Sequence, residues 1–326
     1  MLLPKQSRKC VTGLAIACSL LLISCAPKEV QQVNLIPKPA QMLMTGGAFQ
    51  IDSVALFGEQ SSQGVNIVID NAWSGSPEGY QLDVTAKGID LRAGSRDGLF
   101  YGLQTLRQLY QNGYIPCVSI IDNPRFKYRG LHLDVSRHFF PKEFILKMLD
   151  ILAYYKINIF HFHLVDTGGW RIEMNNHPNL TKMTAYRPAE NLGDWRGMRN
   201  AFCLKEDANA YGGYYTKDDI REIVHYAMVR HITVIPEIDM PGHSRDVLCA
   251  YPELACDGKN YFQSNELCIG KEETFRFCES ILLEIMELFP SKYIHIGGDE
   301  ANRGIWNTCP SCQKRMHDEH IESVAG

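Results

Sequence analysis

Two adjacent acids, Asp299 and Glu300, are the residues of this sequence best suited to acid–base chemistry. They follow a glycine pair in the run Gly297-Gly298-Asp299-Glu300, which lets the backbone turn sharply and a ligand approach closely. Two neighbouring carboxylates repel each other, so one of them is pushed toward its protonated form. A protonated carboxylic acid is what the departure of a glycosidic oxygen requires. The alternative interpretation is a solvated turn in which the acids cap a following helix.

The spacing of these acids limits the mechanism. Side chains of consecutive strand residues diverge, so Asp299 and Glu300 are poorly placed to face each other across one bond as a nucleophile and an acid about 5 Å apart. We expect one to donate a proton and the other to contact a different part of a sugar. This division of tasks favours a mechanism without a protein nucleophile.

A second group of candidate residues lies in the run from Pro236 to Ser244. A predicted strand ends at Asp239, the chain turns through Pro-Gly, and His243 follows. An Asp–His pair beside an acid can tune the pKa of that acid, so we expect Asp239 and His243 to support it. A purely structural histidine at a turn is the alternative.

A third group, His161, His163 and Asp166, lies on one predicted strand. The two histidines share a strand face and are half of a possible metal site, but no acid-rich partner set with metal spacing accompanies them. We therefore predict no metal and no cofactor. Asp166, at the strand end, is better suited to bind sugar hydroxyls.

Arg129 opens the first predicted strand of this region, and Asp134 lies at its far end. A guanidinium can hold two sugar hydroxyls at once, so Arg129 is our candidate for binding them. A surface arginine that merely precedes a strand is the alternative.

The elements that must position these residues alternate between strand and helix. Strands are predicted over 130–135, 158–165, 233–238 and 293–297, and helices over 142–156, 216–230 and 274–289. Phe144, Met148, Leu152 and Tyr155 have the spacing of one helix face. The acids cluster at the strand ends, as in a TIM barrel. A doubly wound sheet is the alternative, but no glycine-rich phosphate turn supports it.

The barrel pattern covers four strand–helix units, whereas a barrel needs eight. The predicted fold class is therefore α/β, the N-terminal half of a (β/α)₈ barrel preceded by a small α+β domain. Because four units are missing, we expect the chain to be truncated at its C-terminus; a complete protein with an unusual four-stranded sheet is the alternative. Half a barrel would leave two open strand edges and should fold less stably.

The preceding unit has its own pattern. Strands are predicted over 65–69, 80–84 and 88–91, the last two as a hairpin, and a helix over 98–110 with Leu99, Leu103, Leu106 and Leu109 on one face. Pro116 and the cluster 122–124 are expected to end this unit. The predicted domains are a small N-terminal domain over 34–124 and the half-barrel over 125–326.

The first 25 residues resemble an export signal. Lys5, Arg8 and Lys9 precede a short apolar stretch that ends at Leu22-Ile23-Ser24-Cys25, the pattern of a bacterial lipobox. We expect cleavage before Cys25, lipidation of its thiol and a short tether over 26–33. The protein would then be exported and lipid-anchored, periplasmic or at the cell surface. An ordinary signal peptide is the alternative.

Charge and cysteine content exclude some partners. The formal net charge of −4, without long runs of one sign, gives no reason to expect nucleic acid, or a membrane partner beyond the lipid anchor. Cys309-Pro-Ser-Cys312 is a lone C-x-x-C pair. His317 and His320 could complete a small zinc site with it, but a disulfide or two buried thiols is the favoured interpretation.

Several long motifs, in order between about residues 34 and 312, together resemble the family-20 glycoside hydrolases, the β-N-acetylhexosaminidases. These motifs are Gly98 to Leu106 (GLFYGLQTL), Arg129 to Phe139 (RGLHLDVSRHF), His161 to Arg171 (HFHLVDTGGWR), Tyr211 to Thr216 (YGGYYT), Pro236 to His243 (PEIDMPGH) and His295 to Glu300 (HIGGDE). The resemblance implies an exo-acting enzyme that releases terminal β-linked GlcNAc or GalNAc from oligosaccharides or glycoconjugates.

The resemblance also implies residue roles. The 2-acetamido oxygen of the substrate attacks the anomeric carbon and forms an oxazolinium ion, so the reaction is retaining and substrate-assisted. Glu300 matches the catalytic acid and Asp299 the residue that holds the acetamide N–H. Asp239 and His243 match the pair that supports the acid. Arg129 and Asp166 match sugar-binding residues.

Three alternatives remain open at this point. The protein could bind amino sugars as a lipoprotein without hydrolysing them, or use a protein nucleophile. It could also be an inactive fragment of the enzyme, because the tryptophans and the tyrosine that complete the sugar pocket in this family belong to the second half of the barrel.

Overall fold

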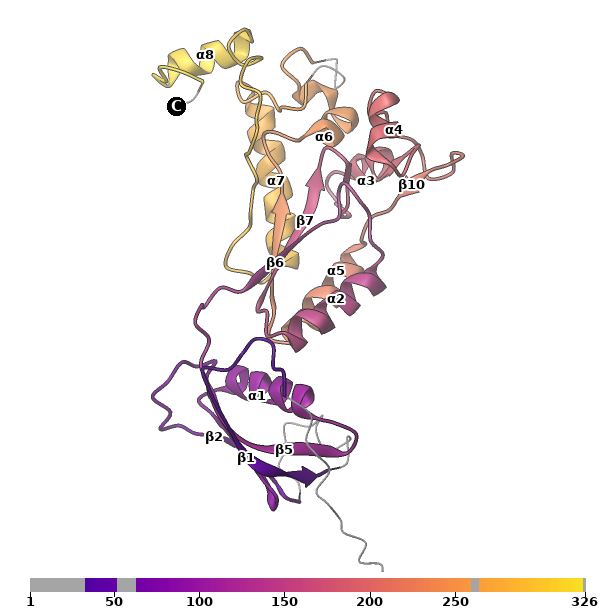
Figure 1. Ribbon diagram of the computed structural model, residues 1–326. Coiled ribbons are helices and arrows are strands. Elements are labelled where there is room, and N and C mark those ends of the chain that lie inside the picture. The colour runs from indigo at the N-terminus through magenta and orange to yellow at the C-terminus, as the bar shows by residue number, and fades with distance from the viewer. Residues whose placement is uncertain (1–32, 52–62, 259–263, 325–326) are drawn as a thin grey trace, which may run out of the picture.

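The computed structural model describes residues 33–51, 63–258 and 264–324 of the chain. The predicted leader over 1–25 and all but the last residue of the predicted tether lie outside these residues. Figure 1 shows an N-terminal part built on one sheet and a larger part with its own strands and helices. Helix α1 (Arg96–Leu109) lies between that sheet and the larger part.

The N-terminal sheet has five strands in the order β1-β5-β3-β4-β2. Their bounds are β1 (Gln41–Gln50), β2 (Val65–Ile69), β3 (Tyr80–Thr85), β4 (Gly88–Ala93) and β5 (Tyr114–Asp122). The predicted hairpin is confirmed, since β3 and β4 pair antiparallel. Only β2 and β4 pair in parallel.

Helix α1 covers one face of this sheet. Ser95 caps it by accepting hydrogen bonds from the backbone N–H groups of Asp97 and Gly98. The predicted stripe of four leucines is confirmed, because Leu99, Leu103, Leu106 and Leu109 are all buried. Burial of this stripe against the sheet forms the N-terminal end of a hydrophobic core that continues into the larger part.

Strands β1 and β5 were not among the predicted elements, and the expectation that Pro116 ends the unit is wrong. Pro116 lies inside β5, opposite Ala48, next to an irregularity of register in β1. It also lies beyond the last residue of β5 that pairs with β3, which is Val118. Because neither neighbour needs the missing N–H at this point, the sheet tolerates the proline.

The larger part is built on three parallel strands in the order β11-β7-β6. The bounds of these strands and of the helices that alternate with them are β6 (Gly130–Asp134), α2 (Lys142–Tyr154), β7 (Ile159–Asp166), α5 (Lys217–Met228), β11 (Thr233–Ile238) and α7 (Glu272–Leu288). The predicted strands over 130–135, 158–165 and 233–238 and the three predicted helices are confirmed to within a few residues. This alternation is that of the first half of a (β/α)₈ barrel.

The buried face of α2 differs from the prediction. The buried side chains are Ile145, Leu149, Leu152 and Ala153. Tyr155 is exposed beyond the helix end. The helix is apolar on more than one side, so spacing alone does not identify which stripe faces the sheet.

Helix α5 begins as predicted. Thr216 accepts a hydrogen bond from the backbone N–H of Asp219, and the Asp219 carboxylate accepts one in return from the N–H of Thr216, which forms a capping box.

Shorter elements connect the main ones. They are β8 (Gly169–Trp170), α3 (Asn179–Thr184), β9 (Tyr186–Arg187), α4 (Leu192–Gly197), β10 (Tyr211–Gly212), α6 (Arg245–Ala250), the 3₁₀ helix η2 (Pro252–Leu254) and α8 (Pro310–Asp318). Among the residues that the structure describes, no helix is long and apolar enough to cross a membrane.

Candidate active site

The carboxyl ends of the parallel strands bring three acids to one edge of the sheet. Asp134 ends β6, Asp166 ends β7, and Asp239 directly follows β11. Parallel pairing of β7 with both neighbours keeps these ends adjacent, despite an irregularity of register between Glu237 and Ile238 of β11. Parallel strands present their ligand-binding groups at this edge, so it is the place to look for the site.

His243 lies in the turn that follows Asp239 and reaches back over this edge. Its backbone is left-handed, with φ of 49°. Its Nδ1 atom lies 3.2 Å from Oδ1 of the buried Asp166. Its Nε2 atom lies 3.6 Å from Oδ2 of Asp299 and 3.5 Å from Oε2 of Glu300. One imidazole therefore links a buried carboxylate to the exposed acid pair.

The segment that carries the acid pair is held against β11. The backbone N–H groups of Ile238 and Met240 donate to the carbonyls of His295 and Ile296, each over 3.0 Å. Only the Glu237–His295 pair forms a parallel bridge, so the predicted strand over 293–297 is reduced to one bridging residue. The described residues provide a partner for it on the β11 side alone.

The two glycines turn this segment next to Asp239. A Cβ atom on Gly297 would lie 1.5 Å from Oδ1 of Asp239, and the φ of Gly297 is 63°, so no other residue fits there. The N–H of Gly298 donates to the same Oδ1 atom over 3.1 Å. Asp239 therefore supports the turn that presents the acid pair.

Asp299 and Glu300 occupy this turn and do not continue a strand. Glu300 has φ of 50°, and both carboxylates lie near the same Nε2 atom of His243. The expectation that their side chains diverge as on a strand is therefore wrong. Their side chains are 65% and 80% exposed, which leaves both open to a substrate.

A charged network underlies the site. One carboxylate, that of Glu237, lies 2.6 Å from His161 Nε2, 3.2 Å from His163 Nδ1 and 3.0 Å from His295 Nδ1. Burial alone would raise the pKa of Glu237, but these imidazoles hold it well below its usual range. The two histidines of β7 thus contact the same buried acid, and this contact accounts for their shared face.

His163 connects this network to the site, because it contacts both Glu237 and Asp166. Burial lowers its pKa, but its contacts with Asp166 and Glu237 outweigh burial and raise it to about 10. Burial, together with the nearby Asp166 carboxylate, raises the pKa of Asp239 to about 6. The hydrogen bond from the N–H of Gly298 acts in the opposite direction and lowers this pKa. A cationic His163 thus lies among carboxylates that would otherwise repel one another.

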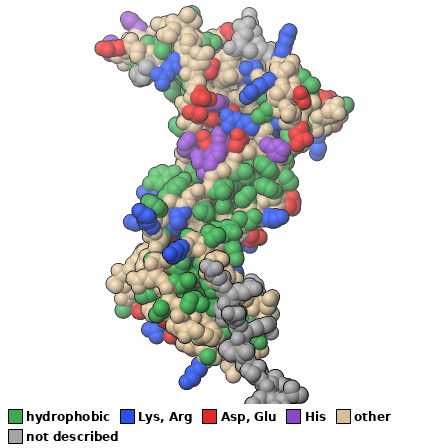
Figure 2. Space-filling model, in the orientation of Figure 1, with side chains coloured by type: hydrophobic (Ala, Val, Ile, Leu, Met, Phe, Trp, Pro, Cys, Tyr) green, Lys and Arg blue, Asp and Glu red, His purple; other side chains and the backbone are tan. Residues whose placement is uncertain are grey.

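Figure 2 shows histidine side chains gathered on one face, beside acidic and basic side chains. His132 and His295 contribute to this exposed surface, with side chains 48% and 50% exposed. His132 Nε2 lies 3.1 Å from His163 Nδ1, so the exposed imidazoles and the buried network are in contact.

Arg137 is a site residue that the sequence analysis missed. Its Nη2 atom lies 2.5 Å from Asp166 Oδ2, and its Nη1 atom lies 2.8 Å from Asp134 Oδ2. Asp134 also accepts the backbone N–H groups of Ser136 and Arg137. The sequence feature that could have identified Arg137 is its position three residues after Asp134, the acid that ends β6. A long side chain at that position can reach the strand ends.

Arg129 does not join the site, which corrects our expectation that it binds sugar hydroxyls. It precedes β6 and Asp134 ends that strand, so the two are roughly 16 Å apart along the chain. Its guanidinium lies 2.9 Å from Glu78 of the N-terminal domain and donates to the carbonyls of Lys156 and Phe126. Arg129 therefore joins the two domains.

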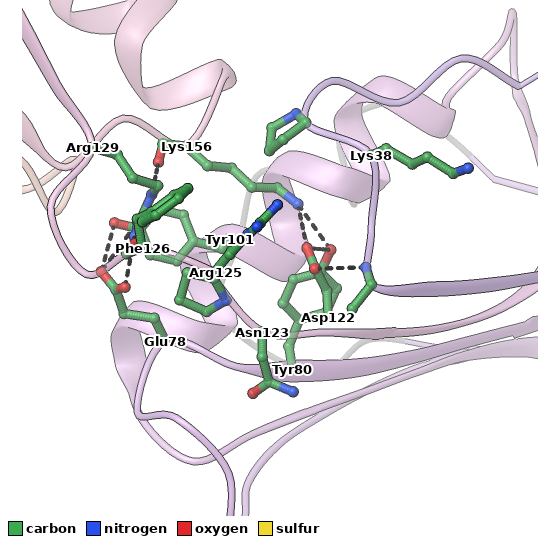
Figure 3. A pocket seen from close by; sticks show the side chains of 13 residues that line it. Lys38, Glu78, Tyr80, Tyr101, Asp122, Asn123, Arg125, Phe126, Arg129 and Lys156 are labelled. Carbon is green, nitrogen blue, oxygen red and sulfur yellow. Dashed lines mark hydrogen bonds and ion pairs between the residues drawn. The ribbon is translucent and has the colours of Figure 1, made fainter.

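This contact belongs to a cavity of about 380 Å³ between the domains. Figure 3 shows Arg129 and Glu78 at one end of it, and Lys156 beside Tyr80 and Asp122 at the other. Lys156 Nζ lies 3.1 Å from the Asp122 carboxylate and 2.9 Å from Tyr80 Oη. These ion pairs connect the N-terminal sheet to the amino ends of the barrel strands.

The site therefore unites five of the six residues proposed from the sequence. Asp166, Asp239, His243, Asp299 and Glu300 converge at the strand ends. Chemically, an exposed acid pair, an imidazole within 3.6 Å of both and a buried charged support can donate a proton and hold a polar group of a substrate.

Comparisons with known proteins agree on one family. The family model described as "Glycosyl hydrolase family 20, catalytic domain" matches residues 126–326, and that described as "Glycosyl hydrolase family 20, domain 2" matches residues 55–123. The curated beta-hexosaminidase of Porphyromonas gingivalis is 34% identical over 95% of this chain and 45% of its own length. That of Vibrio furnissii is 41% identical over 74% of this chain and 40% of its own length.

Solved structures give the same answer. An exo β-N-acetylglucosaminidase of Vibrio harveyi, solved with N-acetylglucosamine, has a TM-score of 0.73 and 31% identity over 89% of this chain and 50% of its own. A β-N-acetylhexosaminidase of Bacteroides fragilis has a TM-score of 0.75 and 31% identity over 89% of this chain and 61% of its own. The chain spans about half the length of the curated relatives it matches.

Proposed function

The chain belongs to glycosyl hydrolase family 20, and from this premise we propose that the protein is an exo-acting β-N-acetylhexosaminidase. It would release terminal β-linked GlcNAc or GalNAc from oligosaccharides or glycoconjugates. The observation that carries the proposal is the convergence of Asp299 and Glu300 on one imidazole, within 3.6 Å, at the carboxyl ends of parallel strands. Relatives named beta-hexosaminidase support it, as does the N-acetylglucosamine in the Vibrio harveyi structure.

In the first step, Glu300 donates its proton to the glycosidic oxygen as the bond to the anomeric carbon breaks. The oxygen of the 2-acetamido group attacks that carbon, and an oxazolinium ion forms. Asp299 accepts a hydrogen bond from the acetamide N–H and stabilises the developing positive charge. In the second step, the Glu300 carboxylate takes a proton from water as the water oxygen attacks the anomeric carbon. The bond between that carbon and the acetamide oxygen breaks, which restores the acetamido group and leaves the configuration retained.

The buried residues hold this pair in place. The contact of His243 with Asp166 fixes the imidazole whose other nitrogen faces the acid pair. The contact of Gly298 with Asp239 fixes the turn below it. These residues position the reacting groups without contacting the sugar.

Arg137 takes the sugar-binding role that we first expected of Arg129. Its side chain is 36% exposed at the strand ends, and its guanidinium is oriented by Asp134 and Asp166. Donors held in this way can bind neighbouring hydroxyls of a sugar with little loss of side-chain entropy. Asp166 contributes by orienting Arg137, since its own side chain is buried.

We also propose that the protein is exported and anchored to a membrane by a lipid. The basic residues Lys5, Arg8 and Lys9, the apolar stretch after them and Cys25 support export and lipidation at Cys25. The protein would then act on glycans in the periplasm or at the cell surface. Fractionation of cells that express wild type or Cys25→Ala tests this: wild type should sediment with membranes, and the variant should not. Equal membrane retention of both would contradict the anchor.

The activity is tested on protein expressed from its complete reading frame. A chromogenic β-N-acetylglucosaminide should be hydrolysed, and a thiazoline that mimics the oxazolinium ion should inhibit competitively. Binding of the sugar without turnover would identify a non-hydrolytic amino-sugar-binding protein. Turnover without thiazoline inhibition would indicate a protein nucleophile.

A further inference from the structure

Four cysteines that are far apart in the sequence meet at one point near the C-terminal end of the described chain. Cys256 follows η2, Cys268 precedes α7, and Cys309 and Cys312 lie at the start of α8. Their sulfur atoms all lie within 4.8 Å of one another. Figure 1 shows α8 at the end of the molecule far from the N-terminal domain, so this cluster is separate from the cavity between the domains.

Three distances between the sulfur atoms are those expected within a tetrahedral site. Cys268 Sγ lies 3.6 Å from Cys312 Sγ and 3.7 Å from Cys309 Sγ, and Cys256 Sγ lies 3.9 Å from Cys312 Sγ. Four sulfurs bound to one Zn²⁺ at about 2.3 Å are about 3.8 Å apart. Cys268 is therefore equally close to two partners, as a shared metal requires and a single disulfide does not.

The backbone around the cluster is shaped to bring the thiols together. A Cβ atom on Gly270 would lie 2.2 Å from the backbone nitrogen of Cys312, so only glycine allows the two segments to approach this closely. The N–H of Gly270 points to the Cys268 sulfur. Cys309 is the N-cap of α8 and Pro310 its first residue, which places both sulfurs of the C-x-x-C pair at a helix N-terminus.

The cluster has a small core of its own. Cys268, Cys309 and Cys312 are buried with Trp306, apart from the main core of the chain. A few thiols and one indole bury little apolar surface, so a metal would supply most of the free energy that holds these segments together.

From this arrangement we propose that Cys256, Cys268, Cys309 and Cys312 bind one structural Zn²⁺ ion. Four protein thiolates fill a tetrahedral zinc site, and no position is left for water or substrate. The ion would therefore stabilise structure and take no part in hydrolysis. It would require all four thiols to lose their protons on binding.

The site fastens two segments that border the acid pair. The segment between Glu300 and Cys309 contacts the loop before Cys268, where Asn302 N–H donates to the Glu266 carboxylate over 3.1 Å. Trp306 Nε1 donates to the carbonyl of Leu267 over 3.1 Å. The same loop contacts the His243 turn, because Leu267 N–H donates to the carbonyl of Pro241 over 2.8 Å. Zinc binding would therefore hold the Glu300 segment against the His243 turn.

Two alternatives to a four-cysteine zinc site are a zinc site that includes histidines, which the structure excludes, and a pair of disulfides, which an experiment can test. His317 and His320, which the sequence offered as zinc partners of Cys309 and Cys312, are exposed on and after α8 and do not belong to the cluster. Two disulfides remain the competing state, and an exported protein meets oxidising conditions. Metal binding and disulfide formation are mutually exclusive, so one experiment separates them.

The experiment measures metal in protein expressed from its complete reading frame and purified without chelator. Elemental analysis and native mass spectrometry should find one zinc per chain, with all four thiols reduced after denaturation. Refolding with Co²⁺ in place of Zn²⁺ should give the visible bands of tetrahedral cobalt and thiolate-to-metal charge transfer. Metal-free protein with two disulfides, or one equivalent of iron, would overturn the proposal.

Variants assign the ligands. Cys268→Ser and Cys312→Ser should each lower zinc content and thermal stability, whereas Cys278→Ser, a half-buried cysteine of α7 outside the cluster, should keep one zinc. If the cluster variants do not fold, thiol alkylation of wild type with and without chelator gives the same answer, because only chelator should expose these four cysteines. Unchanged alkylation would contradict the site. Neither readout depends on hydrolase activity.

Discussion

His243 and Asp166 are in contact, with Nδ1 of the histidine 3.2 Å from Oδ1 of the buried aspartate. The contact comes from different elements, since Asp166 ends β7 and His243 lies in the turn after β11. The remaining ring nitrogen faces the exposed pair Asp299 and Glu300. The position of the imidazole, and with it that of the acid pair, therefore depends on a buried charge.

We expect His243→Asn to lower kcat about thirtyfold with little change in KM, because it removes a contact with charged groups worth about 2 kcal/mol. Asparagine tolerates the left-handed backbone at this position, where φ is 49°. His231→Asn is the matched control, since His231 has φ of 57° but contacts Asp97 of the N-terminal domain. Steady-state kinetics of both variants measure this. A raised KM at unchanged kcat would make His243 a substrate ligand.

Replacement of the two arginines that flank β6 should affect different properties, catalysis for Arg137 and stability for Arg129. Arg137→Ala should lower kcat/KM by about a hundredfold, or about 3 kcal/mol, mostly through KM, because Asp134 and Asp166 lose the guanidinium between them and the sugar loses its donors. Arg129→Ala should leave kinetics unchanged but lower stability by about 2 kcal/mol, since the half-buried Glu78 carboxylate loses its cation and keeps only neutral hydrogen-bond donors. Steady-state kinetics and thermal unfolding of both variants show which arginine binds the substrate and which stabilises the contact between the domains. Loss of substrate binding in Arg129→Ala would restore the original expectation.

The sequence was sufficient to predict where the acids would be. Alternation of strands and helices placed Asp166 and Asp239 at strand ends, and the structure confirms those strands. The sequence was not sufficient to predict which arginine lies at the site. Arg129 and Arg137 flank the same strand, and only the strand's direction and length decide which of them reaches the carboxyl edge.

Other features depended on contacts that spacing does not encode. The C-x-x-C spacing of Cys309 and Cys312 did not predict that Cys256 and Cys268 lie beside them. Those two cysteines come from loops that only the tertiary structure brings to the pair. Strand β5 was missed because Pro116 normally argues against a strand. The turn at Asp299 required a left-handed Glu300, which no propensity favours.

The glycine pair offers a test of the turn. Gly297→Ala should abolish most activity, because its Cβ would collide with Asp239 Oδ1 and displace the acid pair. Gly298→Ala is the matched control: its φ of 90° also disfavours alanine, but its Cβ would meet only the Met240 carbonyl at 3.8 Å. Both should lose about 1–2 kcal/mol of stability from backbone strain. Equal activities in the two variants would show that the contact with Asp239 does not position the acids.

The charge of His163 predicts a pH dependence of stability. Its pKa of about 10 in the folded protein exceeds the value of about 6.5 expected when unfolded, so the folded state holds the proton more tightly. The stability that this proton contributes is complete below pH about 6.5 and is lost as pH rises toward about 10. Asp239, with a pKa of about 6, titrates below this window.

We therefore expect the free energy of unfolding of wild type to fall across this window, and that of His163→Gln to fall less. Denaturant titrations at a series of pH values measure both slopes. His177→Gln serves as the control, because that imidazole contacts Ser280 outside the charged network and burial lowers its pKa. The same slope in His163→Gln as in wild type would mean that His163 is not the group responsible.

The most direct test of the account is the leaving-group dependence of Glu300→Gln. If Glu300 protonates the departing oxygen, the variant should lose about 10²- to 10⁴-fold in turnover of a disaccharide, whose leaving group needs that proton. It should lose far less with a dinitrophenyl glycoside, whose leaving group departs as an anion. Turnover of the disaccharide close to that of wild type would remove Glu300 from the role of catalytic acid.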